Sequence, residues 1–192
     1  MRDFTPPLAD GKVLWHFSMS LDGFIAGPGH SMDWLEGLSD QPGLIEPYVE
    51  TLGAVIAGRD GFDAFGHGKP YGDWDGPVFV LTHHPEDAAP APGFTFLNCD
   101  AAEAVRIARK AAAGKNIEVH SASIGRQLLE LGLIDEIDLH IAPVLLGDGI
   151  RLYDKPGGRP IRLHATLQDD PLAELNVRYR PLPATLTEPA VA

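Results

Sequence analysis

Short apolar segments alternate with helix-like segments along this chain, and that order limits the folds it can adopt. Four apolar segments bounded by turn residues have the character of buried strands: 13–19, 54–57, 78–81 and 117–120. The segments between or after them are typical of helices, at 43–53, 58–65, about 100–113 and about 123–131. Three alternating segments then follow with no helix between them: 136–142, 161–168 and 174–180. This order predicts a three-layer α/β/α sandwich, with a mostly parallel central sheet, helices on both of its faces and an antiparallel C-terminal edge.

Two of the predicted helices carry start and stop signals. Asp100 and Glu103 have the spacing of a capping box at the start of the third helix. Ser123 is the expected cap of the fourth helix, which would bury Ile124, Leu128 and Leu131 on one face and stop at Gly132.

The composition fits one acidic globular domain. The 192 residues suit a single domain, with a core over about 13–181 and loose termini at 1–12 and 182–192. The 27 acidic residues outnumber the 15 basic ones, and the net charge of −12 argues against nucleic acid, which needs basic surface. Cys99 is the single cysteine, and no segment reaches the roughly 20 apolar residues of a membrane span. We therefore expect a cytoplasmic protein without signal peptide, membrane contact or internal disulfide.

In a sheet of this kind, ligands bind at the carboxyl ends of the strands. The loops that leave those ends are 20–34, 58–61, 82–85, 120–124 and 143–151. Three of them suit phosphate groups, because they place small or cationic residues where a strand turns into a helix or loop. Their candidate ligands are Gly58, Arg59, Asp60, Thr82, His83, His84, Ser121, Ala122, Ser123 and Ile124.

Each of these loops also has a plainer interpretation. Arg59 can be a solvated residue in a helix-starting turn, and Ser123 an ordinary helix cap. His83 and His84 raise the question of a metal, but adjacent side chains on an extended segment point apart and the chain has no matching HxxxH or CxxC pattern. We therefore predict no metal site.

The two remaining loops suit a flat substrate. Glycines in 20–35 allow close backbone approach, and Trp34 is able to pack on a ring. Leu146 and Gly147 belong to an apolar lip that is equally consistent with a tight hairpin loop. Asp22 is either a substrate-positioning carboxylate or a structural turn residue.

Four stretches in the same order resemble a known family. They are SMSLDGFIAGP, AVIAGRDGFDAFG, PVFVLTHHP and VHSASIGRQLLELGLIDEIDLHIAPVLLGDGIRLYD. Together they are similar to the dihydrofolate-reductase-like proteins that include the reductase domain of the bifunctional riboflavin-biosynthesis deaminase-reductase. The likeness is greatest to stand-alone bacterial members, and it covers about residues 13–180. It implies a dihydrofolate-reductase-like three-layer α/β/α sandwich, in agreement with the order of elements, and NADPH as the hydride donor.

The resemblance also implies roles for individual residues. Gly58, Arg59 and Asp60 would meet the pyrophosphate and 2′-phosphate, and Thr82, His83 and His84 the adenosine-phosphate side. The turn Ser121, Ala122, Ser123 and Ile124 would lie under the pyrophosphate and nicotinamide ribose. The residues beside the nicotinamide would be Ile25, Ala26 and Gly27, and those around the substrate Asp22, Asp33, Trp34, Leu146 and Gly147. Of these, Asp22, Asp33 and Trp34 are the candidate catalytic residues.

The chain departs from the family pattern at three points. The family's Gly-Gly before the last helix is His120-Ser121 here. The residue after Gly-Arg is Asp60, and an acid repels a 2′-phosphate, so NADH stays an alternative to NADPH. Neither Glu36 nor Asp40 lies one helical turn past the loop tryptophan, where dihydrofolate reductases carry a carboxylate, so folate reduction is not predicted.

The sequence thus predicts a reductase that transfers hydride to a small heterocyclic molecule. Two rival functions remain open: a nucleotide- or ligand-binding protein without turnover, and pyrimidine reduction in riboflavin synthesis. We also expect a homodimer, because the closing strands end the sheet and carry alternating apolar residues, Leu163, Leu167, Leu175 and Val177.

Overall fold

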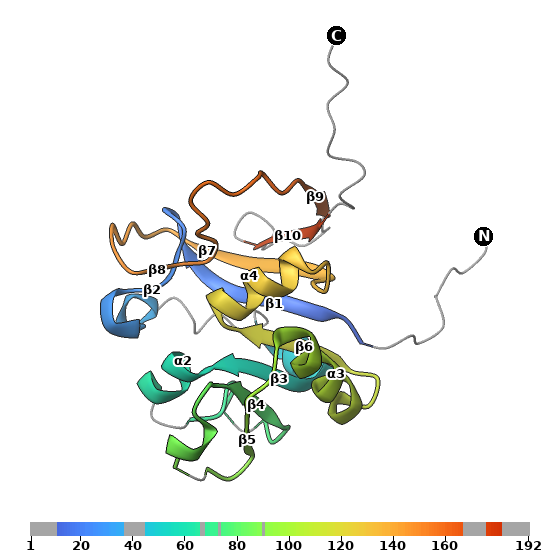
Figure 1. Cartoon of the computed structure of the whole chain (residues 1–192). Helices are drawn as coiled ribbons and strands as arrows, with labels where there is room; N and C mark the ends of the chain where they lie inside the picture. The colour runs from blue at the N-terminus through green and yellow to red at the C-terminus, as the bar shows by residue number, and fades with distance from the viewer. Residues whose placement is uncertain are drawn as a thin grey trace, which may run out of the picture.

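The computed structural model describes residues 11–36, 45–65, 68–72, 74–89, 91–166 and 176–181. An eight-stranded sheet in the order β5-β4-β3-β6-β1-β7-β10-β9 forms its centre (Figure 1). The strands are β1 (Val13–Ser20), β3 (Leu52–Gly58), β4 (Val78–Leu81), β5 (Phe94–Leu97), β6 (Asn116–His120), β7 (Glu136–Ala142), β9 (Leu163–Thr166) and β10 (Asn176–Pro181). Only β10, against β7 and β9, pairs antiparallel in this sheet. The predicted sheet with its antiparallel C-terminal edge is confirmed.

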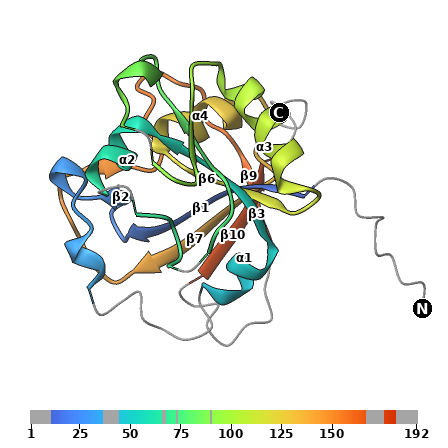
Figure 2. The same ribbon diagram turned by 90° about the horizontal axis from the view of Figure 1, so that it is seen from below.

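Helices cover both faces of the sheet. The described helices are α1 (Glu46–Thr51), α2 (Arg59–Ala64), α3 (Ala101–Ala112) and α4 (Ala122–Glu130). Figure 2 shows α3 and α4 on one side of the sheet and α1 on the other. Apolar residues of α3 and α4, such as Ala108 and Leu128, pack with Ile56 and Val119 in one core cluster, whereas Phe62 of α2 packs with Val55 in a second. The three-layer prediction therefore holds.

The start of α4 corrects the sequence analysis. Its cap is Ser121, whose Oγ accepts a hydrogen bond from the Ile124 N–H, and Ser123 lies inside the first turn. The helix begins earlier than expected because β6 ends at His120 and the chain turns at once. Ile124 and Leu128 are buried as predicted, but Leu131 is 58% exposed. Gly132 follows the helix with a φ of +69°, as its predicted stop requires.

A close contact fixes α4 against the sheet. Trp15 is buried in β1, and its indole N–H donates to the Ser121 carbonyl at 3.2 Å. A Cβ on Gly125 would lie 2.1 Å from the Trp15 ring, so only glycine fits there. The helix N-terminus is thereby held at the carboxyl end of β6.

Several short elements were not predicted. The edge strand β5 was missed, and so was the two-stranded sheet of β2 (Phe24–Ala26) and β8 (Ile150–Arg151). Asp100 caps α3 as predicted, accepting from the Glu103 N–H at 2.7 Å. The predicted loose termini lie almost wholly outside the described residues. None of the helices in the described part of the chain has the length and apolar character that crossing a bilayer requires, and the cytoplasmic location stays a prediction.

Candidate functional site

A cavity of about 1460 Å³ opens at the carboxyl ends of the parallel strands. Segments far apart in the sequence line it, and they include every loop that was expected to hold phosphates. All but one of the predicted cofactor residues are in its wall: Ile25, Ala26, Gly58, Arg59, Asp60, Thr82, His83, His84, Ser121, Ala122, Ser123 and Ile124. Gly27 is not in the wall. It is buried, and its backbone N–H donates to the Ser31 carbonyl.

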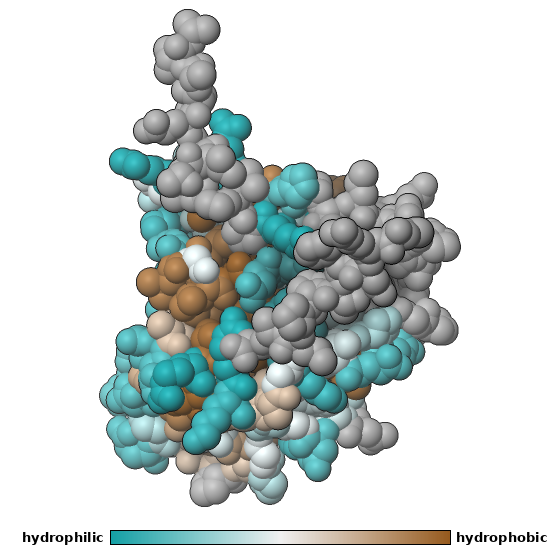
Figure 3. All heavy atoms as spheres, turned by 90° about the vertical axis from the view of Figure 1, so that its right-hand side faces the viewer, coloured by the Kyte–Doolittle hydropathy of each residue, from teal (hydrophilic) through white to brown (hydrophobic). Residues whose placement is uncertain are grey.

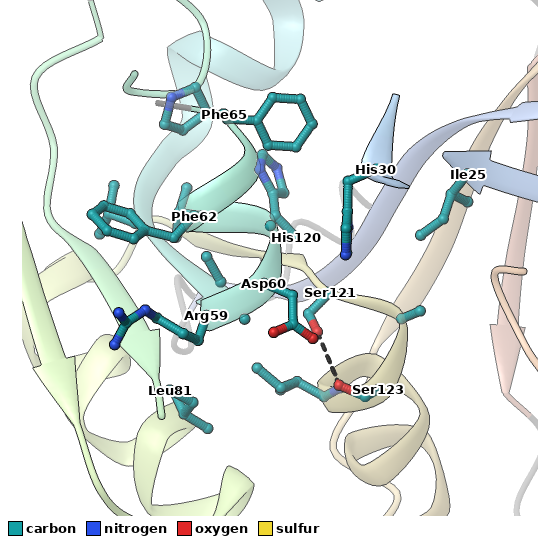
Figure 4. Close-up of a pocket in the computed structure, with 18 of the residues that line it drawn as sticks. Ile25, His30, Arg59, Asp60, Phe62, Phe65, Leu81, His120, Ser121 and Ser123 are labelled. Atoms are coloured by element: carbon teal, nitrogen blue, oxygen red, sulfur yellow. Dashed lines mark hydrogen bonds between the residues drawn. The ribbon is translucent and has the colours of Figure 1, made fainter. Parts of the chain in front are cut away.

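The ends of β3 and β6 meet closely in the middle of this wall. A Cβ on Gly58 would lie 2.9 Å from the Ser121 Oγ, so glycine lets the two strand ends approach. The hydroxyls of Ser121 and Ser123 lie 3.3 Å apart at the N-terminus of α4 (Figure 4). Hydroxyls and free N–H groups at a helix start favour an anion.

Arg59 is held in place at the same end of the cavity. Its Nε donates to the Asp63 carboxylate at 2.7 Å, one helical turn away, and its Nη1 to the His84 carbonyl at 3.4 Å. Figure 4 shows the Asp60 carboxylate near Ser121, within the same space. The lining of this end of the cavity therefore contains both a cation held by Asp63 and the exposed carboxylate of Asp60.

The predicted substrate residues are placed elsewhere. Asp22, Asp33, Trp34, Leu146 and Gly147 are not among the residues that line the cavity, although Met32 and Leu35 are. The indole N–H of Trp34 is buried without a hydrogen-bond partner. The structure therefore does not bring these five residues together with the cofactor loops.

Asp22 has a structural role. Its carboxylate accepts hydrogen bonds from the Ser20 hydroxyl at 2.6 Å and from the backbone N–H groups of Leu146 and Gly147 at 3.1 and 2.7 Å. The Ser20 bond, together with these N–H groups, lowers the pKa of Asp22 to about 2. Asp22 therefore joins the loop after β1 to the loop after β7, which supports the turn-residue alternative.

Sequence reasoning predicted His83 and His84 as cofactor residues but missed the buried polar side chains of the sheet, which form the deep wall of the cavity. Six of the eight histidines line the cavity: His16, His30, His83, His84, His120 and His140. His16 and His140 are buried, and their Nε2 atoms lie 2.6 Å apart. The Nδ1 of His16 lies 3.1 Å from the Tyr71 hydroxyl. The sequence did carry a signal for this wall, because two predicted strands have polar residues at alternate positions: Glu118 and His120 in one, and Asp138 and His140 in the other.

Three buried carboxylates lie on the same face of the sheet, and they differ in their partners. Asp138 pairs with Arg178 and accepts from the Tyr48 hydroxyl at 2.5 Å. Glu136 pairs with Lys12 and Arg180. Glu118 instead accepts from the Tyr71 hydroxyl at 2.5 Å and lies 3.0 Å from the Nε2 of His120.

The environment of Glu118 favours its charged form. Burial acts to raise the pKa of this carboxyl, but the imidazoles of His120, at 3.0 Å, and of His16, at 3.5 Å, outweigh it and hold the pKa well below its usual range. Burial, and then the Asp138 carboxylate, raise the pKa of the Tyr48 hydroxyl well above its usual range, so Tyr48 stays a hydrogen-bond donor.

The question of a metal arises at one surface cluster. In the described part of the chain, His84, Glu86 and Asp87 place one ligand atom each within 4.8 Å of one another. The sequence analysis had not considered these two acids as partners of His84. All three side chains are exposed, and clusters of this kind are common on acidic surfaces.

Known proteins resemble this chain in sequence and in fold. The family model of the RibD C-terminal domain matches residues 71–171. The uncharacterized protein YwjB of Bacillus subtilis is 31% identical over 168 residues, which are 82% of this chain and 91% of that protein. The crystal structure of a putative riboflavin biosynthesis protein from Shewanella sp. PV-4 matches this fold with a TM-score of 0.71 at 19% identity, over 90% of this chain and 99% of that protein. Dihydrofolate reductase from Enterococcus faecalis, solved with NADP(H), has a TM-score of 0.58 at 14% identity, over 90% and 97%.

Proposed function

Because this chain belongs to the family of the RibD C-terminal domain, we propose that it is a NAD(P)H-dependent reductase that transfers hydride to a small heterocyclic substrate. The observation that carries the proposal is the meeting of the strand-end loops in one cavity of about 1460 Å³. Pockets for drug-sized ligands measure about 300–1,000 Å³, so this cavity has room for a dinucleotide and a substrate together.

The wall residues fit such a cofactor. Gly58 and Ser121 bring two strand ends together beside the N-terminus of α4, and this arrangement would hold a pyrophosphate. The buried residues Ile25 and Ala26 would give an apolar surface beside the nicotinamide and exclude water. A bound dihydronicotinamide supplies a hydride, and the chain supplies binding, orientation and electrostatics.

NADPH is the proposed cofactor, with NADH as the alternative. Arg59 is oriented by Asp63 and would make a charged hydrogen bond to a 2′-phosphate. Asp60 on the same turn is exposed and opposes that phosphate. The attraction of the 2′-phosphate to Arg59 and its repulsion by Asp60 would together set the preference for NADPH over NADH.

The test is oxidation of NADPH or NADH by the full-length chain with ring compounds that carry C=N, C=C or C=O bonds. We expect substrate-dependent loss of the dihydronicotinamide absorbance with at least one compound. Saturable nucleotide binding with no oxidation across the panel would instead support the binding protein without turnover.

Riboflavin-type pyrimidine reduction is less well supported. A ribose-phosphate substrate needs a cation in its site. Within the described lining the only lysine or arginine residues are Arg59, which the proposed cofactor would use, and Lys69, which pairs with Asp75.

We further propose that the protein is a homodimer paired through its C-terminal strands. β9 is an edge strand. Its first residue, Leu163, is 38% exposed, and Ile161 just before the strand is 37% exposed. Figure 3 shows apolar surface on the side of the molecule that faces right in Figure 1. Leu167 and Leu175, and the side chain of Val177, lie outside what the structure describes.

Sedimentation equilibrium tests the dimer. We expect twice the mass of one 20.7 kDa chain, and folded monomer for Leu163→Asp. A wild-type mass of one chain contradicts the dimer.

A further inference from the structure

Glu118 is a fully buried carboxylate without a permanent cation. Its residue surface is 0% exposed, whereas Asp138 and Glu136 on the same face pair with arginine or lysine. Among the described residues, no lysine or arginine lies within ion-pair distance of Glu118, and its cationic neighbours are imidazoles, His120 at 3.0 Å and His16 at 3.5 Å. A buried charge needs an opposite charge close by. In the described part of the chain, these two imidazoles are the groups that can offer Glu118 a positive charge within ion-pair distance.

The two imidazoles differ in their surroundings. Both ring nitrogens of His16 are engaged inside the protein, Nδ1 with Tyr71 and Nε2 with His140. His120 uses Nε2 for Glu118, and in the described part of the chain no hydrogen-bond partner is found for its Nδ1. Its side chain is 25% exposed and lines the cavity, and Figure 4 shows the ring beside the space that Ser121, Asp60 and His30 surround. Only His120 of this pair can present a proton to a ligand.

The other polar groups packed around Glu118 support this arrangement. Tyr71, from the loop before β4, donates to Glu118 and touches the His120 ring edge-on. His16 on β1 stacks on Tyr48 of α1 and bonds to His140 of β7. Asp138 and Arg178 neutralise each other next to Tyr48. Among the described residues, His120 and His16 are therefore the side chains that can balance the charge of Glu118.

We propose that His120, held by Glu118, is the general acid that protonates the substrate during reduction. This rests on the proposed function. A bound dihydronicotinamide would supply the hydride, with its electron pair, to one atom of the substrate double bond, and the Nδ1–H of His120 would give its proton to the other atom. The two electrons that reduce the substrate would come from the dihydronicotinamide, and the neutral His120 ring would regain a proton from water at its exposed edge.

The deciding measurement is nitrogen NMR of the histidine rings in the ¹⁵N-labelled full-length chain at neutral pH. The His120 signals are assigned by their loss in His120→Gln. We expect both ring nitrogens of His120 to carry protons in the wild type, and the ring to become neutral in Glu118→Gln. Glu86→Gln is the matched control, because Glu86 lies beside the exposed His84, and it should leave the His120 signals unchanged.

A neutral His120 ring in the wild type overturns the proposal, and this result needs no variant to fold. A ring that stays charged in Glu118→Gln overturns the role of Glu118. With any compound that the wild type reduces, His120→Gln should lower kcat about 10²–10⁴-fold and leave the cofactor KM nearly unchanged. A rise in cofactor KM alone would make His120 a phosphate ligand and contradict the proposal. Failure of both NADPH and NADH to bind the wild type defeats the proposed function separately, whatever the ring signals show.

Discussion

The Nε2 atoms of His16 on β1 and His140 on β7 lie 2.6 Å apart inside the protein. Both residues are buried, at 4% and 6% exposure. One ring must donate a proton and the other must accept it, because two N–H groups cannot face each other at this distance.

This pair predicts a measurable coupling in stability. We expect His16→Ala or His140→Ala to lower the free energy of unfolding by about 1–3 kcal/mol, because each leaves a buried partner unsatisfied. The double variant should lose less than the sum, with a coupling of about 0.5–3 kcal/mol in urea unfolding. His16→Ala combined with His84→Ala is the control and should be additive, since His84 is exposed. Additivity of the buried pair would contradict the hydrogen bond.

The lowered pKa of Asp22 predicts that the stability of the folded protein depends on pH at acid pH. Its pKa falls from 3.8 in the unfolded chain to about 2 in the folded protein, because the folded protein hydrogen-bonds the charged form. A depressed carboxyl pKa stabilises the fold above the unfolded value, and that contribution is lost as the pH falls through the folded value. The difference in unfolding free energy between wild type and Asp22→Asn should therefore shrink between these two pH values. A difference that stays constant over this range argues against the role of Asp22 in joining the loops.

The close packing of Gly125 against Trp15 predicts that no larger residue is tolerated at position 125. Gly125→Ala would put a methyl group 2.1 Å from the Trp15 ring. Overpacking costs about 1–3 kcal/mol, which outweighs the helix preference of alanine, about 1 kcal/mol. Gly61→Ala in α2 is the matched control, because nothing lies within 4 Å of its added Cβ. Thermal unfolding should show a loss for Gly125→Ala only; equal midpoints for the two variants would contradict the close packing.

Arg59 predicts cofactor selectivity. Arg59→Ala should weaken NADPH binding about tenfold or more, the worth of a charged hydrogen bond of roughly 1.5–3 kcal/mol, and weaken NADH binding less. Arg106→Ala is the control, because Arg106 pairs with Glu103 on α3 and does not line the cavity. Equal losses for both cofactors in a calorimetric titration would move Arg59 to the pyrophosphate.

Local patterns in the sequence were sufficient to predict the strands of the central sheet other than β5, and to locate the loops at their carboxyl ends. Gly58 is the last residue of a strand and Arg59 directly follows it, and Ser121 lies where a strand turns into a helix, so both positions can be located without the fold. Such segments meet at one edge because the strands are parallel.

The deep wall and the role of Asp22 depend on distant contacts. Asp22 binds N–H groups 124 and 125 residues away, and His16 and His140 are 124 residues apart. Only the pairing of β1 with β7, which sets Ser18 beside His140 and His16 beside Asp138, brings these polar positions to one face. No local pattern encodes that register. The cap of α4 was misplaced by two residues because Ser121 and Ser123 are both good caps, and the end of β6 chooses between them.

The most direct test of the central claim is a calorimetric titration of the full-length protein with NADPH and with NADH. The account predicts saturable binding of at least one of them with one site per chain, tighter for NADPH if the Arg59 charge outweighs that of Asp60. Absence of saturable binding for both reduced cofactors would contradict the claim that this cavity holds a nicotinamide dinucleotide.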